Sequence, residues 1–449
     1  MLLDSLELVA EKLLEHAKLR GADDADVIAT KGQSISVDVR NGALENADRA
    51  EGVEVGLRVL VSQRQAIVSS SDISDTTLEL MVERAIAMAQ DAPEDKHAGL
   101  ASVNQLAKQR DLSGLEICDA TAEPSPTNLQ EKAEIAESAA LEVGGISQVS
   151  GASASYGKYS VFMAASNGFT ANYDRSSNSV SCVAIAGEGL NMERDYDADT
   201  RVYQSDLRPS DEIGRTAGLR AVERLNPRRP ATGSYPVIYD ERVSSGLVGH
   251  FLSAINGAAI TRGSSWLKDS LGKQVLPSTC KLVENPHRLR AGASRLFDSE
   301  GLATKKREIL SKGVLNGWTL DLASARKLGM KPTANASRSA SSNPSPTNWN
   351  IELSSPKDYC DNLLNEMRNG LLVTSLIGST INPNTGDYSR GVSGFWVENG
   401  QICYPVSEIT IAGNLRDMLK KIILGNDAQR HLSYVVPSIL VEEMTLAGS

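Results

Sequence analysis

The run from Arg242 to Arg262, RVSSGLVGHFLSAINGAAITR, has no charged residue between its two arginines. Its apolar side chains recur at the spacing of one helix face: Val243, Leu247, Phe251 and Ile255. Ser245, Gly246, Gly249 and Ser253 fall on the opposite side of this helix. A helix with apolar side chains on one side and small residues on the other can be packed against neighbouring elements on both sides. The serines, glycines and His250 argue against a membrane span, so the run predicts the buried central helix of a soluble domain.

His250 is the only residue of this predicted helix that commonly binds a metal. A zinc peptidase helix needs two metal-binding histidines and a glutamate that activates the metal-bound water. The residues that lead to His250 include neither: Ser245, Gly246, Leu247, Val248 and Gly249. By its residues alone, the helix carries one histidine that could bind a metal but lacks the other residues that a zinc site needs.

Composition and charge exclude several classes of protein. The chain has 449 residues, enough for two or three domains. Its net charge of −10, with no basic stripe, argues against a general nucleic-acid binder. The start, MLLDSLELVAEKLLEH, has early acids and is not the pattern of a signal peptide. The five cysteines form no CxxC pair, so we expect a reducing, cytoplasmic location and no disulfide framework.

Residues 1–228 predict an N-terminal α/β part made of two helix–strands–helix units, 1–92 and 127–228. In the first unit, the periodicity favours a helix at 2–20, strands at 25–29, 34–39, 53–61 and 65–69, and a helix from Thr76 capped with Glu79. In the second unit it favours a helix from Thr127, strands at 148–155, 159–165, 169–173 and 180–186, and a helix at 210–225. Turn signals occur at Lys31-Gly32, Asn41-Gly42 and Asn167-Gly168, and residues 92–126 are predicted to be a polar connector.

Residues 229–449 predict a strand-rich antiparallel domain around the buried helix, so the expected fold class is α+β. The run 226–232, NPRRPAT, is typical of a boundary. Further strands are predicted at 235–239, 371–376, 394–397, 401–405, 408–411 and 439–444, with a hairpin turn at Asn399-Gly400. Helices are predicted from Pro356 to Met367 and at 415–424, and the low-complexity run 337–346 is predicted to be a mobile surface loop.

Several stretches of the second half resemble one known family. They are GLVGH (246–250), DSLGKQVLP (269–277), NPHR (285–288), FDSEG (297–301) and TGDYSRGVSGFWVENGQICYPVSEITIAGNL (385–415). Together they are similar to the TldD/PmbA family, also called the modulator-of-gyrase family, and within it to the PmbA, or TldE, branch. The run 385–415 is the most specific of these matches, and the resemblance covers essentially the whole chain.

The resemblance implies a subunit of a heteromeric cytoplasmic metallopeptidase. TldD-type subunits of the family carry an HExxxH motif and a catalytic metal, and TldE-type subunits pair with them. The pair degrades or trims unfolded peptides, including steps in peptide-antibiotic maturation and antitoxin turnover. Aligned on that motif, Ser245 and Gly246 replace the first histidine and the glutamate, and His250 takes the place of the second histidine. The family's cysteine ligand near the C-terminus has no counterpart here, the nearest stretch being around Ser438.

The resemblance therefore implies no catalytic residue and no cofactor in this chain, with zinc supplied by a TldD-type partner. The expected partners are that subunit and peptide substrates, with a possible homodimer when the chain is alone, and neither nucleic acid nor membrane. His250 is then either a vestigial ligand position or a buried histidine that is hydrogen-bonded to the backbone. Asp387 and Arg390, with Glu398, either bind peptide or form a structural ion pair. For Cys403, packing in the sheet is the default expectation and a nucleophile the alternative.

Two other functions stay open at this stage. The first is a non-hydrolytic structural or regulatory binding protein that acts as a homo-oligomer. The second is a stand-alone metal enzyme with ligands far apart in sequence: His287, Asp298, Glu300 and His431. The spacing of DSEG is equally typical of a turn that ends in Gly301. Direct action on DNA or gyrase gains little support from the charge.

Overall fold

A six-stranded antiparallel sheet in the order β3-β2-β1-β4-β5-β6 organises the first half of the chain. The computed structural model describes residues 2–355 and 359–448. The strands are β1 (Asp24–Arg40), β2 (Ala43–Val61), β3 (Arg64–Ser70), β4 (Ile146–Ala165), β5 (Thr170–Ala186) and β6 (Glu193–Arg201). Because β1 pairs with β4, residues 1–92 and 127–228 share one sheet. We propose residues 1–228 as one structural unit and 229–449 as the other.

The strands of this sheet are longer than the sequence pattern predicts. The turn predicted at Lys31-Gly32 is wrong, because β1 continues through Gly32, which pairs with Gly52 on one side and Tyr159 on the other. Pairing on both sides keeps this polar stretch extended, and the same merging joins the short strands predicted within β4 and β5. The predicted turns at Asn41-Gly42 and Asn167-Gly168 are confirmed, and Gly42 and Gly168 have φ of 69° and 87°.

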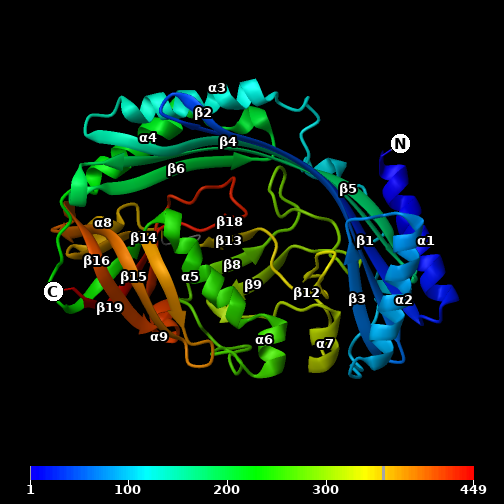
Figure 1. The fold of residues 1–449 in the computed structure, drawn as a ribbon. Helices are drawn as coiled ribbons and strands as arrows, with labels where there is room; N and C mark the ends of the chain where they lie inside the picture. Colours follow the sequence, from blue (N-terminus) through cyan, green and yellow to red (C-terminus); the bar gives the residue numbers. More distant parts are fainter. Residues whose placement is uncertain (1, 356–358, 449) are drawn as a thin grey trace.

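Four helices cover one face of this sheet. They are α1 (Leu2–Leu19), α2 (Asp75–Asp91), α3 (Pro126–Leu141) and α4 (Ser210–Glu223). On β1, Val27 and Ala29 pack with α1 and α2, whereas Val37 and Val39 pack with α3 and α4. Side chains alternate along a strand, so these odd-numbered residues share a face and both helix pairs lie on it. Figure 1 shows the sheet as an arch with these helices on its outer side.

The helix starts differ from the predicted ones by a residue or two. The N-cap of α2 is Ser74, so the predicted capping box from Thr76 to Glu79 is wrong and both residues lie inside the helix. The N-cap of α3 is Ser125, whose hydroxyl accepts from the Asn128 N–H.

The opposite, concave face of the sheet packs against the connector and the second half of the chain. Ile28, Val161 and Met163 point to this face and form a buried cluster with Leu112, Leu115, Ile117, Phe297 and Ala340. The connector, which contains the short helices η1 (Val103–Gln105) and η2 (Ser113–Leu115), is therefore not wholly polar as predicted. Two further short helices, η3 (Gly189–Asn191) and η4 (Gln204–Asp206), flank β6.

Two main sheets and a two-stranded hairpin are present in the second half of the chain. The larger main sheet has the strand order β16-β15-β14-β7-β19-β17. In it β14 and β7 are parallel, and the other neighbouring strands are antiparallel. The smaller main sheet has the strand order β10-β9-β8-β13-β18. The larger sheet contains β7 (Gly233–Tyr239), β14 (Gly370–Ile381), β15 (Asp387–Glu398), β16 (Gln401–Asn414), β17 (Ile422–Leu424) and β19 (Ile439–Ala447). The smaller contains β8 (Lys281–Glu284), β9 (Arg307–Ser311), β10 (Val314–Leu315), β13 (Ile351–Ser354) and β18 (Tyr434–Val435). The predicted α+β class is confirmed.

The central helix lies between these two sheets but is broken. It consists of α5 (Glu241–Ala254) and α6 (Gly257–Arg262), and the Asn256 side chain caps the second segment by accepting from the Ala258 N–H at 2.9 Å. Leu247 and Phe251 of α5 belong to the core that also holds residues of β8, β9 and β14. The predicted enclosure of the small-residue side is wrong, because Ser253 is exposed and a Cβ added at Gly249 would meet nothing within 4 Å.

The remaining helices are short: the first lies where no helix was predicted, and the last two are shorter than predicted. They are α7 (Leu322–Leu328), α8 (Leu363–Met367) and α9 (Leu415–Lys420). The predicted start at Pro356 lies outside the described residues, and α8 begins only after Asn362, whose side chain caps it. Residues after Lys420 form β17 because they pair with β19. Among residues 2–355 and 359–448, none of the helices has both the length and the apolar character that a membrane crossing needs.

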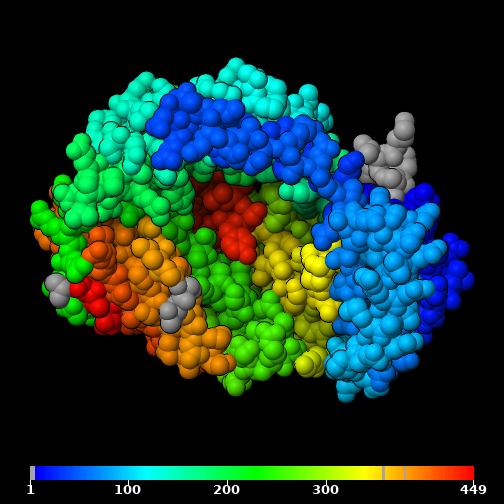
Figure 2. Space-filling model, viewed as in Figure 1, coloured from blue at the N-terminus to red at the C-terminus, as the bar shows by residue number. Residues whose placement is uncertain are grey.

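The run 337–346 is a docked hairpin, so the predicted mobile surface loop is wrong. Strands β11 (Ala336–Ser337) and β12 (Ser345–Pro346) pair, and Ala340 between them is buried against the concave face of the sheet. The backbone of Ala340 lies directly over Gly56 of β2, where a Cβ would overlap its carbonyl oxygen. Between the arched sheet and the second half of the chain a hollow remains, with the segment around β18 at its floor (Figure 2).

We expect Gly56→Ala to destabilise the protein by about 1–3 kcal/mol, because backbone atoms of Ala340 cannot move away without undocking the hairpin. The measurement is urea unfolding. Gly52→Ala is the matched control, since Gly52 lies on the same strand and a Cβ there would meet nothing within 4 Å. Equal midpoints for the two variants would contradict the close approach at Gly56.

Candidate functional site

His250 lies in the middle of α5 and faces strand β15. Its ring is half-buried, and its Nε2 is buried without a hydrogen-bond partner among the described residues. The ring packs edge-on against Tyr388, with 6.0 Å between the centroids. Tyr388 in turn accepts a hydrogen bond at 3.3 Å from the hydroxyl of Tyr239, which is fully buried on β7. The histidine is thus held by packing against a pair of phenols.

A positive charge stands beside this histidine. Burial, and next the positive charge of Arg390, lower the pKa of His250, so the imidazole is neutral at pH 7. Arg390 lies on β15, and its Nε is buried without a hydrogen-bond partner among the described residues. The guanidinium and the imidazole therefore share a sparsely hydrogen-bonded interior between α5 and the larger sheet.

These neighbours of His250 do not fit a zinc ion. Zinc sites in proteins use three or four ligands drawn from imidazole, thiolate and carboxylate, and here the charge that acts on the imidazole is that of a cation, Arg390. One turn earlier, Ser245 and Gly246 supply neither an imidazole nor a carboxylate. Space is not the obstacle, since a Cβ added at Gly246 would touch only Leu376, at 3.8 Å. Across residues 2–355 and 359–448, no three His, Cys, Asp or Glu side chains lie together as a metal site requires.

Asp387 and Arg390 do not form one site. They lie three residues apart on β15, whose pairing with β16 is regular from Asp387 to Val392, so their side chains project from opposite faces of the strand. Asp387 is exposed and accepts hydrogen bonds from Thr385 Oγ1 at 2.6 Å and Asn414 Nδ2 at 2.9 Å, which lower its pKa. Glu398 accepts from Trp396 Nε1 at 3.1 Å. Asp387 therefore orders a turn, and only Arg390 reaches the interior near His250.

Among the described residues, no three of the four ligands considered for a stand-alone metal enzyme lie together. His287 Nε2 lies 3.1 Å from Thr304 Oγ1, and His431 Nε2 lies 3.5 Å from Asp199 Oδ1. Asp298 and Glu300 are engaged elsewhere, as described next. Cys403 is exposed on β16, with its Sγ 3.5 Å from the Gln401 carbonyl oxygen.

Asp298 and Glu300 order the seam between the sheet and the second half of the chain. Asp298 is buried and accepts from the N–H groups of Glu300, Leu302 and Ala336, each at 3.0 Å. Glu300 accepts from the Leu322 N–H at 2.8 Å, at the first turn of α7. Burial, together with the negative charges of Asp298 and Asp321, raises the pKa of Glu300 to about 8.

Arginines of the same seam tie the docked hairpin to the sheet. Arg58 Nε donates to Asp26 Oδ2 at 2.8 Å, and Arg338 of the hairpin also pairs with Asp26. Arg58 and Arg338 line a cleft next to Glu300. The DSEG run is thus part of a buried polar interface, and its carboxylates are used to hold loops.

Sequence models of three domains match the chain in succession. The PmbA/TldA metallopeptidase domain 1 matches residues 25–89, the central domain matches 122–225, and the C-terminal domain matches 232–448. Metalloprotease PmbA of Escherichia coli O157:H7 is 39% identical over 447 residues, which cover 99% of this chain and 96% of that protein. The chain belongs to the PmbA/TldD metallopeptidase family.

Solved structures of this family have the same fold. A crystal structure from Bacteroides thetaiotaomicron, described as a modulator of DNA gyrase, superposes with a TM-score of 0.90 at 28% identity and covers all of both chains. TldE from Thermococcus kodakarensis superposes with a TM-score of 0.84 at 19% identity, covering 98% of this chain and all of that one, which shows the shared fold.

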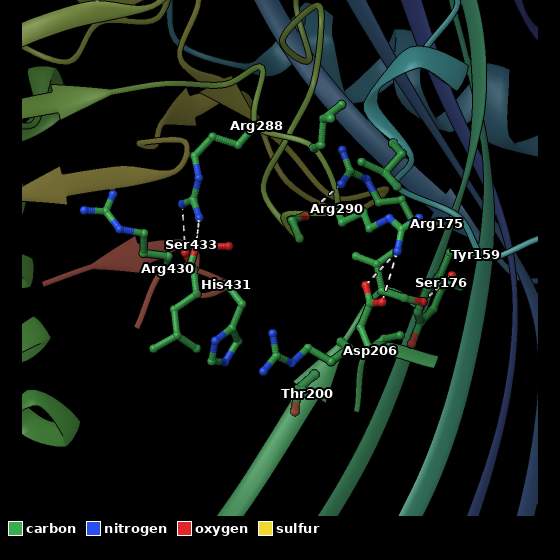
Figure 3. A pocket seen from close by; sticks show the side chains of 17 residues that line it. Tyr159, Arg175, Ser176, Thr200, Asp206, Arg288, Arg290, Arg430, His431 and Ser433 are labelled. Atoms are coloured by element: carbon green, nitrogen blue, oxygen red, sulfur yellow. Dashed lines mark hydrogen bonds and ion pairs between the residues drawn. The ribbon is translucent and has the colours of Figure 1, made fainter. Parts of the chain in front are cut away.

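The sequence does not reveal one feature of this chain, a basic pocket. Five arginines and one histidine border a cavity of about 470 Å³: Arg175, Arg201, Arg288, Arg290, Arg430 and His431 (Figure 3). They come from three distant segments, so no basic stripe is visible along the chain. The NPHR run, which carries Arg288, was the only signal available, and it was used as a family match without a role.

We expect Arg390→Gln to raise the pKa of His250 toward its ordinary value, because the variant removes a positive charge that disfavours the imidazolium. An NMR pH titration of the histidine ring protons measures it. His287 is the internal control, since burial lowers its pKa and Arg390 plays no part in that shift. An unchanged His250 titration would show that the two side chains do not interact.

The raised pKa of Glu300 predicts a loss of stability as the pH rises. The folded state binds this proton more tightly than the unfolded state, so the stabilisation is complete below the ordinary glutamate range and disappears as the pH passes about 8. Glu300→Gln should reduce that loss, by up to about 1.4 kcal/mol for each pH unit within the window. Urea unfolding at pH 5 and pH 8.5 measures it, with the exposed Glu79→Gln on α2 as control. If the free energy of unfolding falls equally between pH 5 and pH 8.5 in Glu300→Gln and in Glu79→Gln, the loss of stability does not come from Glu300.

Proposed function

We propose that this chain is the PmbA/TldE-type subunit of a heteromeric cytoplasmic metallopeptidase that degrades or trims unfolded peptides. Its substrates would include peptides in antibiotic maturation and antitoxin turnover. The catalytic zinc is supplied by a TldD-type partner. When bound there, zinc polarises the scissile carbonyl and lowers the pKa of its bound water.

The observation that carries this proposal is the surroundings of His250. The residue in the position of the second motif histidine has a guanidinium for a neighbour, and Ser245 and Gly246 replace the other two functional residues. A cation at that place opposes a divalent metal. A neutral histidine that packs on Tyr388 is a stable alternative to a ligand, so the helix keeps its fold without the ion.

This chain contributes the walls of the reaction chamber. The hollow between the arched sheet and the second half of the chain supports this role, because a peptide held there is shielded from bulk water. The small-residue side of α5 is open at Gly249 and Ser253, which gives an extended backbone room beside the helix. Arg390 is proposed to assist substrate binding, whereas Asp387, on the opposite face of β15, is a turn residue and serves as its control.

The test is metal content of the dialysed chain together with a peptide-cleavage assay, run alone and with a TldD-type partner. We expect no stoichiometric metal in this chain, no cleavage by it alone, and cleavage by the pair. A partner whose motif glutamate is replaced by glutamine is the control, and its pair should be inactive. In the active pair, Arg390→Gln should raise KM while Asp387→Asn should not.

Two outcomes would sink the proposal. One zinc per chain with cleavage by the chain alone would return the chemistry to this subunit. A chain that forms a homo-oligomer and captures no TldD-type subunit in a pull-down would favour the alternative, a non-hydrolytic structural or regulatory binding protein.

A further inference from the structure

The basic pocket lies on the concave side of the sheet, where β5 and β6 meet two loops of the second half of the chain. Arg175 comes from β5, Arg201 from β6, Arg288 and Arg290 from the loop after β8, and His431 from the segment before β18. Figure 3 shows Arg175 and Arg290 on one side of the cavity and Arg288 and His431 on the other. None of these residues belongs to the surroundings of His250.

Part of this positive charge is neutralised by carboxylates. Arg290 donates from Nε to Glu116 at 2.6 Å and from Nη1 to Asp206 at 3.0 Å. Arg201 Nε donates to Asp199 at 2.9 Å. Arg430 Nη1 lies 3.4 Å from Glu352 Oε1, so Arg201, Arg290 and Arg430 each have a carboxylate partner.

Arg175 and Arg288 are different, because they donate to backbone carbonyls. Arg175 donates to Gly292 O at 2.7 Å and Ser294 O at 2.5 Å, and Arg288 donates to Leu432 O at 2.8 Å and also to Arg430 O. A carbonyl oxygen carries no formal charge, so each hydrogen-bonded guanidinium keeps its full positive charge. Within residues 2–355 and 359–448, neither forms an ion pair with a carboxylate.

Two guanidinium groups without a carboxylate partner among the described residues raise the electrostatic free energy of the empty pocket. Burial lowers the pKa of Arg175 and of Arg288, which means that the charged forms are incompletely solvated. The backbone bonds fix both side chains in position, and preorganised guanidinium groups are well suited to carboxylates. An anionic ligand would therefore supply the charge that the chain itself leaves out.

The rest of the lining indicates which anion fits. Leu289, Leu432 and Tyr159 border the same cavity and expose 62%, 40% and 50% of their surface. A ligand that covers these side chains must be partly apolar, which a small inorganic anion is not. A peptide segment with a carboxylate meets both requirements, and a cavity of about 470 Å³ has room for a few of its residues.

We propose that this pocket, centred on Arg175 and Arg288, binds the carboxylate of a peptide. The carboxylate is that of the C-terminus or of an acidic side chain. The choice of a peptide rests on the proposed function, whereas the anion site itself rests on the two arginines. The pocket would then fix one end of a substrate while another part of it reaches the catalytic partner.

The test is calorimetric titration of the full chain, without a partner, using four probes. They are N-acetyl-trialanine, its C-terminal amide, N-acetyl-Ala-Glu-Ala amide and inorganic phosphate. We expect the first or the third to bind and the amide of trialanine not to bind, which identifies the source of the carboxylate. Tighter binding of phosphate than of either acidic peptide, or binding of neither acidic peptide more tightly than the amide of trialanine, would overturn the proposal.

Variants connect the binding to the named residues. Arg288→Gln should weaken the acidic probe at least about tenfold, as expected for loss of a charge-assisted hydrogen bond. Arg215→Gln, at an exposed position on α4 outside the pocket, should leave it unchanged. Equal affinity of the Arg288→Gln variant and the unmodified chain would contradict the assignment.

A measurement on the unmodified chain avoids any effect of a substitution on folding. Burial, and the charges of Arg201, Arg208 and Arg288, lower the pKa of His431, against the opposing effect of Asp199. A bound carboxylate should raise that pKa in an NMR titration, and no change at saturating acidic probe would exclude binding in this pocket. These binding measurements involve no cleavage. If no probe binds, the proposal of a metallopeptidase subunit is unaffected. If this chain and its TldD-type partner together do not cleave peptides, the proposal of a carboxylate-binding pocket is unaffected.

Discussion

The fold depends on a sheet that has helices on only one of its faces. The odd-numbered residues of β1 face α1 to α4, so the even-numbered ones need another cover. That cover consists of the connector, the loop around Phe297 and the hairpin that carries Ala340. Because these segments cover the concave face only in part, a hollow remains beneath the arch, and the basic pocket borders the same concave side (Figure 2).

The positive charge of arginine side chains has opposite effects on ligand binding in the two candidate regions. Around His250, Arg390 stands beside a neutral imidazole and leaves no attraction for a metal cation. In the basic pocket, Arg175 and Arg288 are held by carbonyl oxygens and keep their charge available. The two regions are separate in the fold, because the arginines of the pocket and residues 245–250 lie on different elements.

Local patterns in the sequence identified most elements but not their ends or contacts. Asn-Gly pairs marked the hairpin turns correctly because positive φ is a local requirement. The extension of β1 through Gly32, by contrast, is imposed by neighbours on both sides. The run 337–346 looked disordered by composition, yet Ala340 is fixed by Gly56, which no local pattern reveals. Arg175 and Arg288 meet only through the tertiary fold, so their pocket was not predictable, whereas the absence of a histidine and a carboxylate at Ser245 and Gly246 is visible directly in the sequence.

The docking of the hairpin on β2 has a consequence for the order of folding. The Arg338 side chain and the Gly56 carbonyl are separated by 282 positions in the sequence. During synthesis, β1 to β6 emerge well before the hairpin, so the part of their concave face that the hairpin and the loop around Phe297 cover stays exposed in the nascent chain. Closing so long a loop is entropically slow, which makes the arch an aggregation-prone intermediate until the second half arrives. A chaperone that shields this concave face would act at that stage of biogenesis.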